Sequence, residues 1–244
     1  MPDQSPERLA EVDTGAVYEG IRGRFVSIVA PLTPDRLNGR VPATPDWSVH
    51  DVLAHVVGIT ADLNRQHFPQ PDDVGGSKWA SAQVDSRRSS GVEQIIREWD
   101  RESDDFEEGL RAFGYEVGSH FVADLHAHYS DVRHAFGLTA DPDPLAIQVS
   151  LDHYLGFIDE LLDGSAWGEV ELTAGGQTWR LGSPGLHRAK VAAEPFELLR
   201  AVSARRSLRQ VRELDWTGDV DELLELLQRG FSSGYSFPNA DMIE

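Results

Sequence analysis

The chain has 244 residues and no cysteine, and this absence excludes several kinds of chemistry. Without thiols it cannot form a disulfide, a thiolate zinc finger or a cysteine nucleophile. The absence also fits a reducing compartment. Any thiol chemistry that this protein performs must therefore take its sulfur from another molecule.

Long apolar runs are also missing. No uninterrupted apolar segment approaches the ~20 residues that a helix needs to span a bilayer. Residues 1–8 lack the basic and then apolar pattern of a signal peptide. We therefore expect a cytoplasmic protein that does not associate with a membrane.

Basic charge is scarce, because 22 Lys and Arg face 41 Asp and Glu and the net charge is -19. Binding to nucleic acid needs a concentrated basic face, which this balance opposes, so we expect no nucleic-acid partner. Only Lys78 and Lys190 are lysines. The remaining basic residues are arginines, which bind carboxylates well. We expect small-molecule ligands and a monomer or a homodimer.

Apolar residues at three- and four-residue steps predict four helices in the first part of the chain. They cover residues 7–31, 48–67, 91–113 and 119–136. Ser48 and Asp51 form a variant of the capping box at the start of the second helix. The segment 68–90 is rich in Pro, Gly, Asp and Ser and is predicted to be a long loop without regular structure, either functional or disordered. Together these patterns predict a four-helix bundle over residues 1–143.

The pattern changes after the turn-rich linker at 139–144. We predict helices and strands in alternation from there on: a helix at 146–163, strands at 169–173, 178–181 and 190–193, and helices at 194–203 and 219–228. The predicted fold class is therefore α+β, with the helical bundle at 1–143 followed by a small α+β domain at 144–244.

Three polar residues of the predicted bundle have the composition of a metal site. At ~100° per residue, Asp124 and His128 lie within ~40° of each other on one helix face, and Asp131 falls on the same side. His55 lies beside the apolar stripe of the second helix. If the two stripes pack into one core, His55, Asp124 and His128 can converge as two nitrogens and one oxygen with a vacant position, which is typical of catalytic zinc.

Two simpler explanations of this pattern stay open. An Asp and a His at positions i and i+4 are commonly a surface pair that contributes a few tenths of a kcal/mol. A single histidine beside an apolar stripe is commonly a hydrogen-bonded core residue.

Three segments resemble a known family. Residues 44–58, TPDWSVHDVLAHVVG, are similar to the tryptophan-containing start of the second helix in the mycothiol-dependent maleylpyruvate isomerase family, which belongs to the DinB-like metal-binding bundles. Residues 128–137 are similar to the H-x-x-D segment of that family, and residues 195–211 resemble its C-terminal half. The matches occur in the same order and extend over most of the chain.

This resemblance implies a DinB-like four-helix bundle with an α+β C-terminal domain, one divalent metal, usually zinc, and mycothiol as the thiol cosubstrate. The ligands of the family fall on His55, Asp124 and His128. Asp124 stands where the family usually has a glutamate, and the shorter side chain brings coordination, metal identity or activity into question. His120, one turn earlier, is either an alternative ligand or simply a polar residue at the start of the helix.

The implied function is a zinc-dependent enzyme that uses mycothiol on a small electrophilic substrate. A thiol bound to zinc loses its proton at neutral pH and becomes a strong nucleophile. The reaction is either a thiol S-transfer or a cis-trans isomerisation of the maleylpyruvate type. Two alternatives are a non-catalytic protein that binds a metal or a small molecule, and a metal-free bundle with a structural or regulatory role.

An anionic substrate in so acidic a protein needs local positive charge. Arg87 and Arg88, at the end of the predicted loop, are candidates for binding mycothiol, and Arg205 and Arg206 for binding substrate carboxylates. Solvated surface arginines are the alternative for each of them. Asp131 is a candidate for orienting a ligand histidine, with an ordinary polar bundle residue as the alternative.

Overall fold

The computed structural model describes residues 11–73, 75–139, 143–165, 167–230, 237–238 and 240–242. The chain forms two compact units, residues 1–149 (unit 1) and 150–243 (unit 2). The boundary falls inside helix α7 (Pro144–Ser165), whereas the boundary predicted after residue 143 lies at the start of that helix. Among the helices of the described ranges, none has the length and apolar character to cross a bilayer.

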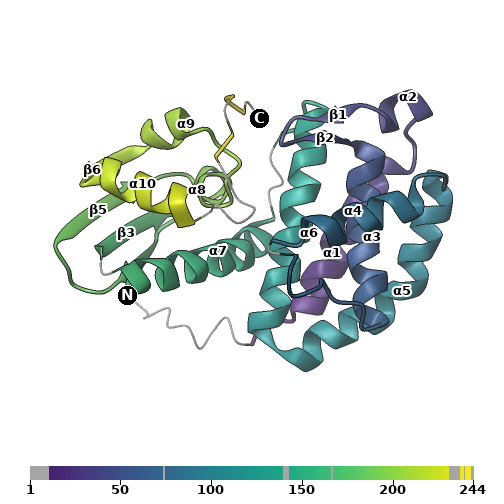
Figure 1. The fold of residues 1–244 in the computed structure, drawn as a ribbon, viewed down its shortest axis with the longest axis horizontal. Coiled ribbons are helices and arrows are strands. Elements are labelled where there is room, and N and C mark those ends of the chain that lie inside the picture. The colour runs from purple at the N-terminus through teal and green to yellow at the C-terminus, as the bar shows by residue number, and fades with distance from the viewer. Residues whose placement is uncertain are drawn as a thin grey trace. The chain divides into compact units, whose positions relative to one another are not determined.

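Unit 1 contains the predicted four-helix bundle (Figure 1). Its helices are α1 (Thr14–Val29), α3 (Val49–Asn64), α5 (Val92–Phe113) and α6 (Tyr115–Ala135). Helix α1 packs against α5 and α6, and α3 packs against the same two helices, which closes the bundle. Residues 7–10 of the predicted first helix lie outside the described residues.

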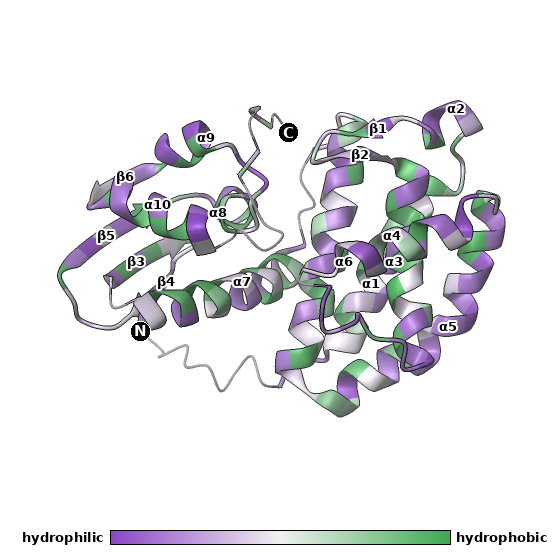
Figure 2. Cartoon of the chain, in the orientation of Figure 1, coloured by the Kyte–Doolittle hydropathy of each residue, from purple (hydrophilic) through white to green (hydrophobic). Residues whose placement is uncertain are grey.

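The core of the bundle consists of the apolar stripes that the sequence predicts. Ile21 and Phe25 of α1, Leu53 of α3, Trp99 of α5 and Tyr129 of α6 are all buried. Figure 2 shows the corresponding alternation of hydrophobic and hydrophilic residues along these helices. Burial of such stripes provides most of the stability of helices of this length.

The start of α3 follows the predicted cap. The hydroxyl of Ser48 accepts a hydrogen bond from the backbone N–H of Asp51, whose carboxylate accepts one from the backbone N–H of Ser48. Strands β1 (Arg40–Val41) and β2 (Thr44–Ser48) form a small antiparallel hairpin that leads directly into this cap. The short helix α2 (Pro34–Leu37) precedes the hairpin.

The prediction of a structureless loop at 68–90 is wrong, because helix α4 (Ser77–Arg87) forms within it. Helix α4 packs against α3 at Gly58. A Cβ atom at Gly58 would lie 2.4 Å from Cβ of Gln83, so only a glycine allows this approach. The helix has no apolar stripe of its own, which explains why hydrophobic periodicity did not predict it.

Unit 2 is the predicted α+β unit. Its sheet has the strand order β4-β3-β5-β6, in which β3 and β5 are parallel and the other neighbours antiparallel. The strands are β3 (Gly168–Ala174), β4 (Gln177–Gly182), β5 (His187–Ala192) and β6 (Asp215–Gly218). Helices α8 (Pro195–Val202) and α9 (Leu208–Arg212) lie between β5 and β6 in the chain, and α10 (Val220–Gly230) follows β6. Strand β6 and helix α9 were not predicted.

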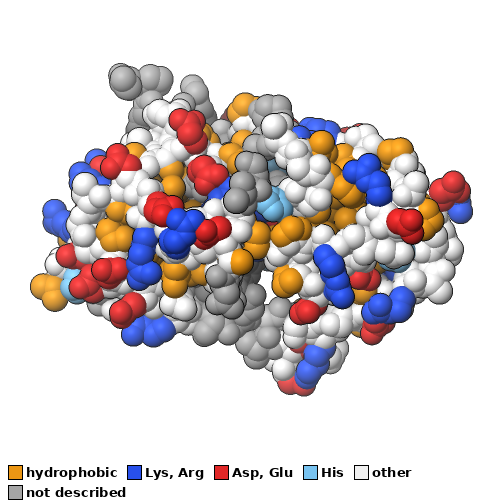
Figure 3. All heavy atoms as spheres, turned by 90° about the horizontal axis from the view of Figure 1, so that it is seen from above, with side chains coloured by type: hydrophobic (Ala, Val, Ile, Leu, Met, Phe, Trp, Pro, Cys, Tyr) orange, Lys and Arg blue, Asp and Glu red, His pale blue; other side chains and the backbone are white. Residues whose placement is uncertain are grey.

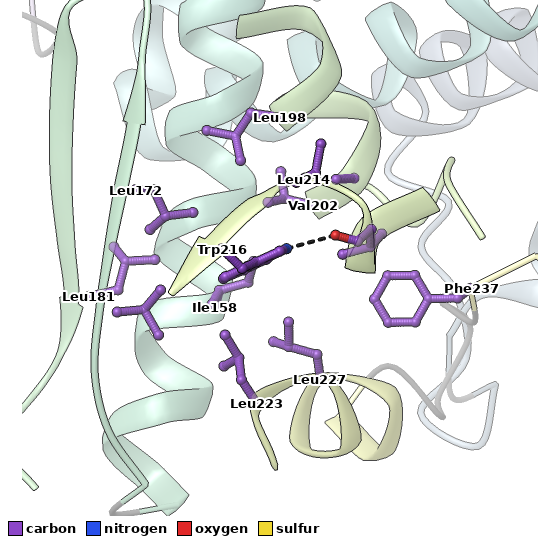
Figure 4. A pocket seen from close by; sticks show the side chains of 13 residues that line it. Ile158, Leu172, Leu181, Leu198, Val202, Leu214, Trp216, Leu223, Leu227 and Phe237 are labelled. Atoms are coloured by element: carbon purple, nitrogen blue, oxygen red, sulfur yellow. Dashed lines mark hydrogen bonds between the residues drawn. The ribbon is translucent and has the colours of Figure 1, made fainter. Parts of the chain in front are cut away.

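The core of unit 2 lies on one face of the sheet. Strand β3 alternates buried residues with half-buried ones, as expected of a sheet covered on one side. A small cavity remains within this core, and apolar side chains from the sheet and from α7, α8 and α10 surround it (Figure 4). The indole Nε1 of Trp216 donates a hydrogen bond of 2.7 Å to the carbonyl oxygen of Val211 at its edge.

Candidate metal centre

Unit 1 brings together the three side chains that the sequence proposes as ligands. His55 comes from α3, and Asp124 and His128 come from α6. One ligand atom from each lies within 4.8 Å of the others. The two imidazole rings are buried, 5.0 Å apart between centroids and nearly perpendicular at 82°, and the carboxylate is half-buried.

The geometry and the donor atoms fit a divalent cation. Nε2 of His128 lies 3.8 Å from Oδ1 of Asp124. Two ligands of tetrahedral zinc, each bonded at ~2.1 Å, are about 3.4 Å apart, so this spacing is close to that of a loaded site. Two imidazoles and one carboxylate suit zinc and several other divalent ions. His120 is exposed, stacks edge-on against Phe121 and is not part of this group.

His55 has one ring nitrogen occupied by a neighbour. Its Nδ1 lies 2.8 Å from Oε1 of Gln83 in α4. Burial lowers the pKa of His55 to about 4, although the hydrogen bond to Gln83 acts in the opposite direction. The imidazole is therefore neutral at pH 7, which is the protonation state that binds a metal.

His128 lies between two carboxylates. Its Nε2 faces Asp124, and its Nδ1 is 3.8 Å from Oδ2 of Asp131, which is completely buried. Asp131 thus has the location of the predicted orienting residue, on the side of the ring opposite to the ligand cluster. Its role toward His128 stays a prediction.

Trp47 and Gln83 are neighbours of the site that the sequence did not assign to it. The ring of Trp47 lies 4.8 Å from that of His55 and 6.1 Å from that of His128, between centroids. Gln83 lies on α4, within the segment that was predicted as a loop, so only the tertiary structure shows its contact with His55.

Arg87 and Arg88 have different surroundings from those expected. Arg87 is buried and makes two hydrogen bonds to Glu98 of α5, at 2.7 and 3.0 Å. This ion pair connects α4 to α5, so Arg87 has a structural role. Arg88 is exposed and pairs with Asp85 on its own helix. A role of either arginine in binding mycothiol stays a prediction, and for Arg87 it would require the pair with Glu98 to open.

Arg205 and Arg206 belong to unit 2. Arg206 is buried and donates hydrogen bonds of 2.9 and 2.6 Å to the carboxylate of Glu197. Arg205 is half-buried and donates one to the carbonyl oxygen of Ser203. Their predicted contact with substrate stays a prediction.

On the face of the molecule shown in Figure 3, Lys and Arg side chains are intermixed with Asp and Glu side chains.

Comparison with known proteins supports the resemblance seen in the sequence. Residues 18–124 match the family model described as the mycothiol maleylpyruvate isomerase N-terminal domain. The structure is similar to crystal structures of the mycothiol-dependent maleylpyruvate isomerase (TM-score 0.51, 13% identity) and of a histidine-to-alanine mutant of that enzyme (TM-score 0.55, 11% identity). Each comparison covers 79% of this chain and 88% of the other. No curated protein matches the chain.

The matched segment contains His55 and ends at Asp124, one helical turn before His128. At these identities the similarity of the structures concerns the fold, and it extends through both units. The predicted fold class, a helical bundle followed by an α+β unit, is confirmed. Residues 18–124 of this chain therefore match the mycothiol maleylpyruvate isomerase N-terminal domain model, and the chain has a fold similar to that of the mycothiol-dependent maleylpyruvate isomerase.

Proposed function

We propose that this protein is a metal-dependent enzyme that uses mycothiol to attack a small electrophilic substrate. The observation that carries the proposal is the convergence of His55, Asp124 and His128 in a chain without cysteine. The two buried imidazoles and the carboxylate would hold one divalent cation, with zinc as the first candidate. Such a cation lowers the pKa of a thiol bound to it, so that the thiol reacts as a thiolate.

The residues of the chain have separate tasks in this proposal. His55 stays neutral through burial and so offers a nitrogen lone pair at pH 7. Asp124 supplies negative charge that offsets part of the charge of the cation. Trp47 covers one side of the two imidazoles with an apolar ring and limits access of water there. Asp131 restrains the ring of His128 on its Nδ1 side, opposite to the ligand cluster.

Two reactions share the first step, in which the mycothiol sulfur forms a bond to an electrophilic carbon. In a cis-trans isomerisation, the electron pair of the attacked double bond moves toward the adjacent carbonyl group. After rotation about the new single bond, the electron pair returns from the carbonyl group to re-form the double bond, and the sulfur leaves with its bonding pair. In an S-transfer the carbon–sulfur bond is kept, the adjacent carbon takes up a proton that balances the one lost by the thiol, and the conjugate is released. The family match and the similar crystal structures support the isomerisation.

The test begins with protein purified without a histidine tag. We expect about one zinc per chain after reconstitution, and an isomerised or conjugated product when mycothiol is supplied with maleylpyruvate or a panel of electrophiles. His55→Ala and His128→Ala should lose the metal while circular dichroism retains the helical signal. The exposed residue His120, changed to alanine, is the matched control on α6 and should keep the metal.

Each other outcome has a definite meaning. Full metal content in the His55→Ala and His128→Ala variants would show that the ligands are wrong. Stoichiometric metal without any product would favour a non-catalytic binding protein. Absence of metal after reconstitution would remove the catalytic proposal and favour a bundle with a structural role.

A further inference from the structure

Gln83 is a buried polar residue that connects the candidate metal centre to α4. Its side chain is only 2% exposed. Its Oε1 lies 2.8 Å from Nδ1 of His55, and its Nε2 donates a hydrogen bond of 3.1 Å to Oδ2 of Asp62. The carboxamide thus spans the space between a candidate ligand and a carboxylate on the same helix, α3.

The carboxylate of Asp62 determines which way the carboxamide points. A carboxylate only accepts hydrogen bonds, so the NH2 group of Gln83 must face Asp62. The opposite orientation would bring two oxygens together at the Asp62 end. With the NH2 group fixed in this way, Oε1 is the atom that faces His55.

The orientation of the carboxamide in turn determines the tautomer of His55. Oε1 can only accept a hydrogen bond, so Nδ1 of His55 must carry the proton. The lone pair of the neutral ring is then on Nε2. Outer partners commonly fix the tautomer and orientation of metal-binding histidines in this manner, with a carboxylate or a carbonyl oxygen as the acceptor.

Helix α4 is held so that Gln83 stays in place. At its start, the carboxylate of Asp73 accepts hydrogen bonds from the backbone N–H groups of Lys78 and Trp79, at 3.0 and 2.8 Å. At its end, Arg87 forms the ion pair with Glu98 of α5. The helix is therefore fixed on both sides of Gln83.

We infer that Gln83 is a positioning residue, which, oriented by Asp62, holds His55 in the Nδ1–H tautomer with Nε2 directed to the metal. The tautomer is a property of the metal-free protein. The effect on metal affinity rests on the proposed function. The two parts can therefore be tested separately.

The first measurement concerns the tautomer in metal-free protein. Long-range ¹H–¹⁵N NMR spectra distinguish the two tautomers of histidine, and the signal that disappears in His55→Ala identifies His55. We expect the Nδ1–H form in the wild type and a mixture, or the Nε2–H form, in Gln83→Leu. Gln94→Leu, an exposed glutamine of α5 changed in the same way, should leave the His55 signal unchanged.

The second measurement is zinc affinity, determined by competition with a chelator. Loss of an outer partner of a metal ligand typically weakens binding by about 10- to 100-fold. We expect a loss in this range for Gln83→Leu and none for Gln94→Leu. Asp62→Asn provides a second variant, because it removes the oriented acceptor and leaves the packing of α4 on α3 intact. It should give a mixture of tautomers and a smaller loss of affinity.

The outcomes separate the inference from the proposed function. If His55 keeps the same tautomer in Gln83→Leu, the inference is overturned. If Gln83→Leu does not fold, an unchanged tautomer in Asp62→Asn has the same meaning. Wild-type protein that binds no zinc but shows the Gln83-dependent tautomer would refute the proposed function and leave the role of Gln83 toward His55 intact. Equal zinc affinity of wild type and Gln83→Leu would overturn the effect on the metal.

Discussion

Changing Gly58 to alanine tests the contact between α3 and α4. A Cβ atom there would lie 2.4 Å from Cβ and 2.6 Å from Cγ of Gln83, and 3.0 Å from Nη1 of Arg87. Separations under 3.0 Å from a Cβ essentially never occur in proteins. Because Cβ of Gln83 is attached to the backbone of α4, a rotamer change cannot relieve the clash, and the helix must move away from α3.

Two opposing effects determine the magnitude. Alanine is preferred over glycine within a helix by about 1 kcal/mol. Overfilling a packed interface typically costs about 1–3 kcal/mol. Gly23 of α1 is the matched control, since a Cβ there would meet nothing within 4 Å. We expect Gly23→Ala to gain up to about 1 kcal/mol and Gly58→Ala to be about 1–3 kcal/mol less stable than that control.

Urea denaturation followed by circular dichroism gives the free energy of unfolding of the two variants and of the wild type. The displacement of α4 should also lengthen the hydrogen bond from His55 to Gln83, so the NMR signal of His55 should change in Gly58→Ala and not in Gly23→Ala. Equal stability of the two alanine variants would refute the close packing of α4 on α3.

Four further predictions concern the candidate site and its surroundings. Asp124→Glu should preserve or raise zinc affinity, because the longer carboxylate is the usual ligand in the family that the sequence resembles. Competition with a chelator measures this affinity. A large loss of zinc binding would show that the bundle accommodates only the shorter side chain. Cobalt(II) should quench tryptophan fluorescence on binding, and Trp47→Phe should remove most of that response because Trp47 is next to the ligand rings; quenching that persists would place the metal elsewhere. The free energy of unfolding of the metal-free protein should fall by about 3 kcal/mol between pH 6.5 and about 4, because in this range the unfolded chain takes up a proton at His55 and the native protein does not. Urea denaturation should show a smaller fall in His55→Ala. An equal fall would contradict the lowered pKa of His55. Arg206→Ala should lower the free energy of unfolding by about 2 kcal/mol through loss of the pair with Glu197, with zinc content unchanged; full stability would contradict a structural role.

The sequence predicts the bundle and the proximity of His55, Asp124 and His128 because both depend largely on local helix geometry. Asp124 and His128 share a face through their spacing alone, and the apolar stripes place that face toward α3. The capping box at Ser48 determines where α3 begins and hence the height of His55 in the bundle. Only the approach of His55 to the other two side chains needs a tertiary assumption, namely that the two apolar stripes pack into one core.

Features that depend on tertiary contacts were not predicted. Helix α4 has no apolar stripe, and it is stabilised by contact at Gly58 and by the ion pair of Arg87 with Glu98. The role of Gln83 follows from the placement of α4, which the hydrophobic pattern of this segment does not indicate. The burial of Arg206 in unit 2 likewise depends on Glu197, nine positions away.

Anomalous X-ray diffraction at the zinc absorption edge, from crystals of the zinc-reconstituted protein, determines whether His55, Asp124 and His128 bind the metal. We expect one strong peak bounded by Nε2 of His55, Nε2 of His128 and the carboxylate of Asp124. Zinc bound at another position, or no peak among these three side chains in a crystal of reconstituted protein, would contradict this expectation.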